Sequence, residues 1–352
     1  MRWFLGLLLV IALVLGALFA VGTFLLPNAL EVTRTVTVER PRAAVFAMVN
    51  DLRIGKEWSP YYARDPDADY TFNGEPGAGQ TMRWASDVRE VGSGRMSIVD
   101  SVHNEEVQSI LEMGERATLN ADMILRRVEG GTAVNWTVTA ECAAGWINVP
   151  CRYMNLILRG VVQKELDSGL ARLKTLAEQL PNVDFENLNP QFDEVQAQPF
   201  VFSVVEVTPP PPTQDPAAAT NLETEIARAE TFGLDQVRRF MDQYQLTQAG
   251  PLTRVVIEQG QERMTYRVGY PYSGARPLTV VGVQLGDTPS GLAMHVLVEG
   301  DRRNISAALA QMDAYLQAHR LSRREGANAW HTVIRPAAPG SPERIEIFMP
   351  LQ

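Results

Sequence analysis

Residues 41–51 of the chain read PRAAVFAMVND, and they follow a run, residues 32–38, in which valines alternate with polar residues. The alternation predicts a strand that buries one face. Proline suits the first helical position, where the backbone N–H has no partner, and Val45, Phe46 and Val49 recur at helical spacing. The stretch therefore predicts a strand that passes directly into a short helix, followed by a second short turn at residues 52–58.

Strand-like runs follow after a loop, residues 58–79, that is rich in proline, glycine and aspartate. Gly130 and Gly131 mark a hairpin turn before the last of these runs. Leucines then repeat at helical spacing within a long helix predicted over residues 149–180. The pattern predicts an α+β domain, residues 30–180, whose antiparallel sheet is closed by one long helix. Its later strands are expected at residues 79–86, 94–101, 105–113, 118–128 and 130–141.

Seven short motifs of this segment carry a family resemblance. They are VFAMVNDL at 45–52, EWSPYYARDP at 57–66, the Gly77-Ala78-Gly79 turn, Trp84, SGRMSI at 93–98, GGTAVNWTV at 130–138 and SGLARLK at 168–174. Together they resemble the SRPBCC superfamily (START-like, polyketide cyclase/dehydrase-like), which has a helix-grip fold. The resemblance implies a cavity between the sheet and its closing helix, in a fold that hosts binders, carriers and occasional cyclases.

The predicted cavity lining consists of strand and loop residues with aromatic or long apolar side chains. These residues are Trp58, Trp84, Met96, Leu111, Met113 and Trp136. The same side chains would also suit a solid core. Asp51, Asp65, Asp100 and His103 fall in predicted turns or strand ends, where capping or solvation explains them, so no catalytic residue is predicted.

The first segment, residues 1–29, is predicted to be a membrane anchor. No charged residue occurs between Trp3 and Leu26, and a helix of that length can cross a hydrocarbon core of about 30 Å. A cleaved signal peptide is the alternative, but its apolar region is usually about 7–15 residues long. The basic start at Arg2 favours a single-pass protein of the bacterial inner membrane with its soluble domains in the periplasm.

Cysteine and histidine are scarce, which limits metal and disulfide chemistry. Cys142 and Cys151 could form one small-loop disulfide in an oxidising compartment, or could be two small buried residues. Their spacing does not match a metal motif. With only four histidines in the chain, no metal site and no cofactor are predicted.

The segment from 199 to 352 is predicted to be a second domain, which follows an acidic linker at residues 181–198. Residues 209–212 are four prolines and are expected in an exposed loop. Strand-like runs and two amphipathic helices, near residues 222–244 and 304–319, repeat the order strand–helix–strand–strand, which indicates an internal duplication. The expected strands are residues 200–207, 252–259, 264–272, 278–285, 291–300, 328–336 and 343–351.

The duplicated order, Gly300, AWHTVIRP at 329–336 and RIEIFMPL at 344–351 resemble the GyrI-like effector-binding domain. The resemblance implies a small-molecule site in the cleft between two halves. The usual closing Trp-Glu-x-Tyr is Trp330-His331-Thr332-Val333 here, which argues against a cationic ligand, and His331 would suit a neutral or anionic ligand or lie on the surface as an ordinary strand residue. The aromatic candidates for stacking are Tyr266, Tyr270, Tyr272 and Trp330.

Composition narrows the function further. With 32 basic and 41 acidic residues, the formal charge is −9, which argues against nucleic-acid binding and a transcription regulator. We therefore predict a membrane-anchored protein that binds a hydrophobic or aromatic small molecule or a lipid, as a sensor or carrier. The alternatives are a helix-grip enzyme such as a cyclase or dehydratase, and an envelope scaffold protein whose protein partners the sequence does not identify.

Overall fold

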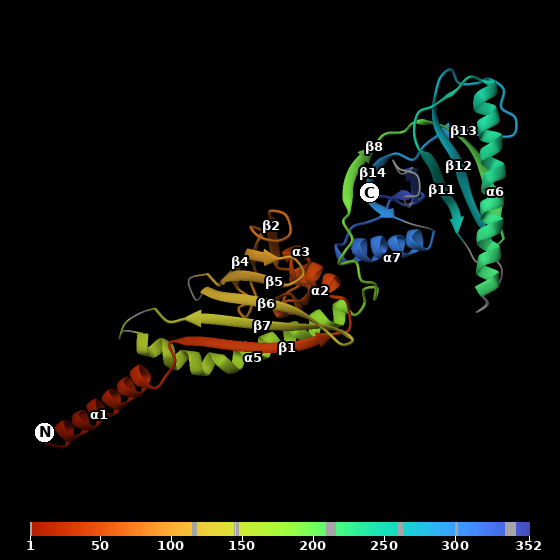
Figure 1. Ribbon diagram of the computed structural model, residues 1–352. Coiled ribbons are helices and arrows are strands. Elements are labelled where there is room, and N and C mark those ends of the chain that lie inside the picture. The colour runs from red at the N-terminus through yellow and green to blue at the C-terminus, as the bar shows by residue number, and fades with distance from the viewer. Residues whose placement is uncertain are drawn as a thin grey trace. The chain divides into compact units, whose positions relative to one another are not determined.

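The computed structural model of the protein describes residues 2–114, 118–143, 145, 148–208, 216–259, 263–299, 302–334 and 343–352. The chain divides into two compact units, Met1–Glu186 with Ala318–Arg320 and Asn187–Gln317 with Leu321–Gln352. Each unit combines helices with an antiparallel sheet, so the predicted α+β class is confirmed (Figure 1).

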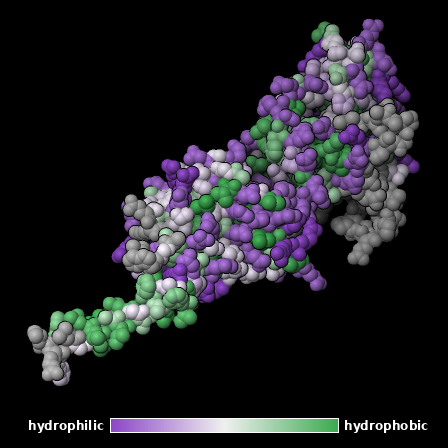
Figure 2. Space-filling model, turned by 60° about the vertical axis from the view of Figure 1, so that its left-hand side comes forward, coloured by the Kyte–Doolittle hydropathy of each residue, from purple (hydrophilic) through white to green (hydrophobic). Residues whose placement is uncertain are grey.

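The chain begins with the apolar helix α1, Arg2–Phe24. Of the described residues, one helical segment, Gly6–Phe24, is long and apolar enough to cross a membrane, with a mean hydropathy of 2.7. Its side chains are almost all exposed, and Figure 2 shows the helix as a hydrophobic extension at lower left. A single-pass anchor is consistent with these properties.

The first unit contains a seven-stranded antiparallel sheet with the order β1-β7-β6-β5-β4-β3-β2. Successive strands are neighbours, except that β7 returns to pair with β1 along its whole length, from Ala29 opposite Glu141 to Val38 opposite Thr132. The predicted antiparallel sheet is thus present. The strands are β1 Ala29–Val38, β2 Asp69–Asn73, β3 Thr81–Ala85, β4 Ser93–Val102, β5 Glu106–Glu112, β6 Thr118–Val128 and β7 Gly131–Glu141.

Strand β2 lies in the segment that the sequence analysis assigned to a loop. It has five residues, DYTFN, and proline, glycine and aspartate surround it on both sides. Its side chains are half-buried or exposed in alternation, because β2 is an edge strand with β3 as its neighbour. A strand this short and this exposed has too few apolar residues to stand out from its surroundings.

Four helices complete the first unit: α2 Arg42–Val49, α3 Leu52–Trp58, α4 Pro60–Arg64 and α5 Val149–Ala177. The side chain of Asp51 caps α3 through the backbone N–H of Arg53, and Ser59 caps the unpredicted α4 through that of Tyr61. Helix α5 runs along the sheet (Figure 1). It buries Leu166, Leu170 and Leu173, which are three of the leucines that predicted it.

Cys142 and Cys151, whose pairing the sequence left open, are joined in a disulfide with their Cα atoms 5.9 Å apart. The bond links the end of β7 to the first turn of α5. The backbone N–H of Cys142 also donates to the carbonyl oxygen of Asn28 at 3.0 Å. The junctions before β1, after β7 and before α5 are therefore held together.

The second unit contains a nine-stranded sheet in which β13-β9-β12-β11-β15-β16-β14-β8 lie in order and β10 pairs with β12. The order strand–helix–strand–strand occurs twice, as β9-α6-β11-β12 and β14-α7-β15-β16, and the two sets meet at the β11–β15 pair. Helices α6 and α7 each pack on an apolar cluster of their own set. The elements are β8 Gln191–Val195, β9 Pro199–Val207, α6 Pro216–Gln243, β10 Thr247–Gln248, β11 Leu252–Gln259, β12 Met264–Ser273, β13 Gln284–Asp287, β14 Gly291–Glu299, α7 Arg302–Ala318, β15 Trp330–Ile334 and β16 Arg344–Pro350.

Two segments of this unit differ from the sequence-based expectation. The segment expected to be a linker contains β8, whose acidic sequence QFDEV is almost wholly exposed at the sheet edge beside β14. Residues 278–283 are not a strand, because Pro277 precedes them, Gly282 has a φ of +81°, and Leu278 and Val281 are exposed. The four prolines, Gly300, Arg335 and Pro336 lie outside the described residues.

Gln80 is a fully buried polar residue that joins the helical segment to the sheet. Its amide nitrogen donates to Asp51 Oδ1 at 2.6 Å, and its amide oxygen accepts from the backbone N–H of Leu52 at 2.7 Å. Gln80 directly precedes β3, so these bonds fix where α3 begins relative to the strand.

We expect Gln80→Ala to lower the free energy of unfolding of the first unit by about 2–4 kcal/mol, because it opens a cavity and removes both hydrogen bonds. Urea unfolding followed by tryptophan fluorescence would measure the change. The control is Gln179→Ala, an exposed position after α5, where a change below about 0.5 kcal/mol is expected. Equal effects of the two substitutions would contradict the role assigned to Gln80.

Candidate ligand-binding site

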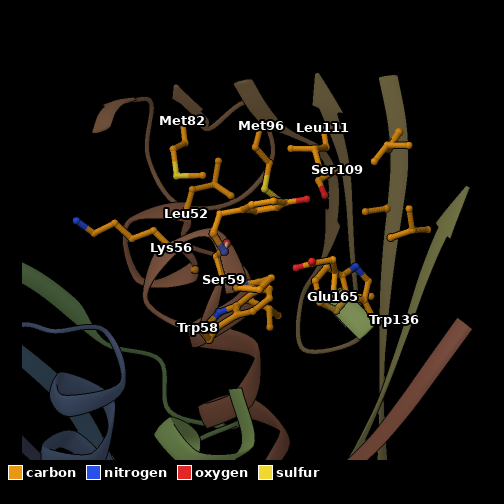
Figure 3. A pocket seen from close by; sticks show the side chains of 18 of the residues that line it. Leu52, Lys56, Trp58, Ser59, Met82, Met96, Ser109, Leu111, Trp136 and Glu165 are labelled. Atoms are coloured by element: carbon orange, nitrogen blue, oxygen red, sulfur yellow. Dashed lines mark hydrogen bonds between the residues drawn. The ribbon is translucent and has the colours of Figure 1, made fainter. Parts of the chain in front are cut away.

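A cavity lies in the first unit between the sheet, the helices α2 to α4 and helix α5 (Figure 3). Its volume is about 110 Å³, which is room for several water molecules or a small ligand group. Its walls are largely apolar. Of the predicted lining residues, Trp58, Trp84, Met96, Leu111 and Trp136 line it.

Met113, the sixth predicted residue, does not line the cavity. It is half-buried just beyond the end of β5, and its Sδ lies 4.0 Å from the hydroxyl oxygen of Tyr61, which does line the cavity. The alternation along β5 brings Val107, Ser109 and Leu111 to the cavity, but the strand ends at Glu112 before Met113 is reached.

The strand register brings the lining residues together in rows across the sheet. Met82 lies opposite Met96, Met96 opposite Leu111, and Leu111 opposite Leu119. A second row places Ser109 opposite Ala121. Directly opposite residues of an antiparallel pair point to the same face, so both rows face the cavity. The second row continues to Ile98 on one side and Val138 on the other, and the short side chains at its centre leave space between the larger residues around them.

Two of the tryptophan rings lie directly against the backbone of a glycine, where a side chain would leave no room for them. A Cβ atom on Gly169 of α5 would lie 2.7 Å from Cζ3 of Trp136, and one on Gly94 of β4 would lie 2.3 Å from Cζ2 of Trp84. Trp136 also meets Trp58 edge to face, with ring centroids 5.5 Å apart. The indole N–H of Trp58 donates to the carbonyl oxygen of Met48 at 3.1 Å.

Three buried polar atoms around the cavity have no hydrogen-bond partner within the described part of the chain. They are Nε1 of Trp84, Nε1 of Trp136 and Oε2 of Glu165. The other carboxylate oxygen of Glu165 accepts from Arg64 at 2.5 Å. Figure 3 shows the Glu165 carboxylate directed into the cavity beside Trp136. The lining residues of this apolar cavity therefore carry two unpaired hydrogen-bond donors and one unpaired acceptor.

Tyr61 and Glu165 are lining residues that the sequence analysis did not identify. Burial raises the pKa of the Tyr61 phenol, and the negative charge of Glu165 raises it further, while Arg64 opposes both. Glu165 could have been found, because Val162, Glu165, Leu166 and Gly169 recur at helical spacing and place one carboxylate on an otherwise apolar face. The position of Tyr61 depends on α4, which no sequence pattern predicted.

Lys56 lines the edge of the cavity, but Figure 3 shows its ammonium group pointing away from it. The ammonium nitrogen lies 5.2 Å from the ring centroid of Tyr70, 5.4 Å from that of Tyr62 and 5.7 Å from that of Phe72. These rings stabilise the charge through cation–π interactions. Lys56 is therefore held outside, and the cavity itself does not receive its positive charge.

The aromatic candidates of the second unit lie in packed surroundings. Tyr266, Tyr270 and Tyr272 are buried against α6. Trp330 stacks on Phe348 with centroids 5.0 Å apart, in the cluster on the opposite face of the sheet. Neighbouring strand residues face opposite sides, so His331, opposite Arg254, points away from Trp330. Neither of the second-unit cavities lined by His295 or by Val256 includes any of these five candidates.

His295 is a buried polar residue that the sequence analysis did not single out. Its Nδ1 lies 2.9 Å from Oε1 of Glu346, and its Nε2 lies 2.8 Å from Oδ2 of Asp193. The ring stacks on Phe348. Because the two ring nitrogens face different carboxylates, the group joins β8, β14 and β16. Among the described residues, no group of three or more His, Cys, Asp or Glu is placed to hold a metal ion.

Comparison with known proteins identifies the class of the first unit. Residues 29–178 match the family described as polyketide cyclase / dehydrase and lipid transport. The chain therefore contains a domain of this class, which confirms the resemblance stated for residues 30–180. No curated protein matches the chain.

Solved structures also show similarity to part of the chain. An uncharacterised protein from Rhizobium leguminosarum is 17% identical, with coverage of 43% of this chain and 97% of its own and a TM-score of 0.33. A protein from Mesorhizobium loti is 10% identical, with coverage of 42% and 97% and a TM-score of 0.32. The di-domain aromatase/cyclase StfQ from the steffimycin biosynthetic pathway is 11% identical, with coverage of 43% and 51% and a TM-score of 0.33.

We expect Gly169→Ala to destabilise the first unit by about 1–2 kcal/mol and to alter tryptophan fluorescence, because the added methyl group would displace Trp136. Gly160→Ala on the same helix is the matched control. A Cβ there meets no atom within 4 Å, so the better helix propensity should stabilise α5 by up to about 1 kcal/mol. If both substitutions stabilised the protein equally, the close contact with Trp136 would be refuted.

Proposed function

We propose that the protein is a membrane-anchored binding protein whose first unit takes up an apolar small molecule or lipid. One observation carries the proposal: an apolar cavity whose lining residues Trp84, Trp136 and Glu165 each carry a buried polar atom without a partner among the described residues. Leaving a buried polar group without a hydrogen bond costs about 1–3 kcal/mol. A ligand that supplies the missing partners would recover that free energy on binding.

The polar atoms also define the ligand's chemistry. An indole N–H requires an acceptor such as a carbonyl or ether oxygen, and a carboxylate oxygen requires a donor such as a hydroxyl. The rest of the cavity wall favours an apolar skeleton. We infer a ligand with an apolar ring or chain and a small number of oxygen groups. The family description, which includes lipid transport and polyketide cyclisation, supports this class of ligand.

We further propose that α1 anchors the protein as a single span in a bacterial inner membrane, with both units on the periplasmic side. The length and hydropathy of Gly6–Phe24 support the anchor. The disulfide between Cys142 and Cys151 supports an oxidising compartment, because such bonds persist there.

The second unit is proposed to be a GyrI-like sensor domain. Its two strand–helix–strand–strand sets, which meet at β11 and β15, support a duplicated architecture with a ligand site between the halves. The missing Glu and Tyr of the closing motif, at His331 and Val333, make a neutral or anionic ligand the better expectation for this unit.

An enzymatic role is the second candidate, and the presence of Tyr61 and Glu165 in the same cavity favours it. A phenol and a carboxylate in one apolar cavity can act as acid and base on a bound substrate. Under this hypothesis Glu165→Gln would abolish turnover of a hydroxylated or carbonyl-containing substrate while binding persisted. A pure carrier would show no turnover with any such substrate.

The binding proposal can be tested with the fluorescent apolar probe N-phenyl-1-naphthylamine and the detergent-extracted full chain. Ala121→Phe places a ring inside the cavity, and we expect it to weaken probe binding at least tenfold because it occupies the ligand's space. Ala85→Phe on an exposed position of β3 is the matched control and should leave binding unchanged. Native mass spectrometry of the same preparations would show whether a small molecule co-purifies with the control but not with Ala121→Phe.

Equal probe affinity in the two variants would overturn the cavity as the binding site. Thermal unfolding of each variant shows whether it is folded. Ser109→Leu, a smaller substitution opposite Ala121, repeats the test if Ala121→Phe unfolds the unit.

A further inference from the structure

The first half of helix α5 carries an exposed apolar stripe. Met154, Ile157, Leu158 and Val161 recur at the spacing of one helix face, and between 40% and 68% of each residue remains exposed. Asn155 and Leu166 are buried, whereas Leu156, which lies on another side of the helix and is not part of the stripe, is also 51% exposed. In a folded unit an apolar stripe of this kind indicates a contact surface.

The stripe is confined to one end of the helix. Beyond Leu166, the exposed positions of α5 are polar or small, with Asp167, Ser168 and Thr175 among them. The outer face of α5 is therefore not apolar along its whole length. The exposed apolar residues are restricted to the part of the helix near its N-terminus, so the surface that they contact is expected near that end.

Helix α1 meets α5 directly before the stripe. Arg152 donates hydrogen bonds to the carbonyl oxygens of Thr23 at 2.8 Å and Gly22 at 3.2 Å, and the hydroxyl of Tyr153 donates to that of Leu18 at 2.7 Å. Gly22 allows this approach, since a Cβ there would lie 2.4 Å from Cγ1 of Val149. The carbonyl groups at the end of α1 are thus satisfied by the residues that precede Met154.

We propose that the stripe formed by Met154, Ile157, Leu158 and Val161 lies in the interfacial layer of the bilayer that α1 spans. The inference rests on the proposed anchor. At 1.5 Å per residue the stripe is about 10 Å long, which suits a helix turn or two resting in the boundary between headgroups and acyl chains. Tyr153 precedes the stripe with a side chain that favours this boundary, because it combines an apolar ring with a polar end.

This placement has a consequence for the cavity. Val162, Glu165 and Leu166 follow the stripe along α5 and form the helix wall of the cavity. If the stripe lies in the interfacial layer, these three residues are within one or two helical turns of the lipid. An apolar ligand could then pass between bilayer and cavity without crossing much water.

Depth measurements on the full chain in phosphatidylcholine–phosphatidylglycerol vesicles test the inference. Single cysteines at Leu13, Ile157 and Ser168 would carry an environment-sensitive nitrobenzoxadiazole label, with the native disulfide intact. Ser168 is the matched control, because it is eleven residues from Ile157 and therefore lies on the same helix face three turns further on. Lipids with a spin label on the acyl chain serve as quenchers.

We expect quenching at positions 13 and 157 and at least twofold weaker quenching at 168. Quenching at 13 with equal, weak quenching at 157 and 168 would overturn the stripe's docking while the anchor stands. An unquenched label at 13 would overturn the anchor and the docking together. A label at 157 that is shielded from water, is not quenched by lipid and forms a cross-linked dimer would assign the stripe to a second copy of the chain instead.

Discussion

The close approach of α5 to the first sheet at Gly169 and Trp136 is the contact on which the site depends. An indole placed between a helix and a sheet holds the two apart, unless the helix residue above it has no side chain. Gly169 satisfies this condition at one point, while Ser109 and Ala121, opposite each other at the centre of the sheet, fill little of the remaining gap. The cavity thus results from one tight contact next to two short side chains at the centre of a row of larger ones.

Helix α5 connects this cavity to the other end of the unit. Its first turn is tied to β7 by the Cys142–Cys151 disulfide and to α1 by Arg152 and Tyr153. Its middle turns line the cavity through Val162, Glu165 and Leu166. Helix α5 therefore contacts the proposed anchor α1 at its first turn and lines the proposed ligand site with its middle turns, so a displacement of α5 at the membrane would be transmitted to the cavity wall.

Local sequence patterns were sufficient for the elements that bury one face over many residues. Alternation predicted β1 and β3 to β7, and leucine spacing predicted α5. Short elements with exposed residues, β2 and β8, were missed because their apolar content does not exceed that of a loop. The same distinction holds for the residues that line the cavity. Strand alternation identified Trp84 and Trp136. Tyr61 was missed because it reaches the cavity only through the packing of α4, which depends on contacts remote in sequence.

The two units differ in how they use their aromatic residues, and this difference argues for the first unit as the place where ligand chemistry is defined. In the second unit Trp330 is stacked on Phe348 and the three tyrosines are packed beneath α6, so the rings contact one another and the core. In the first unit Trp84 and Trp136 line the cavity and each packs against a glycine, and their N–H groups have no partner in the described part of the chain. A core optimised only for stability would fill that space with apolar side chains and would not bury unpaired donors there. The arrangement is explained if a ligand normally accepts those hydrogen bonds and donates one to Glu165.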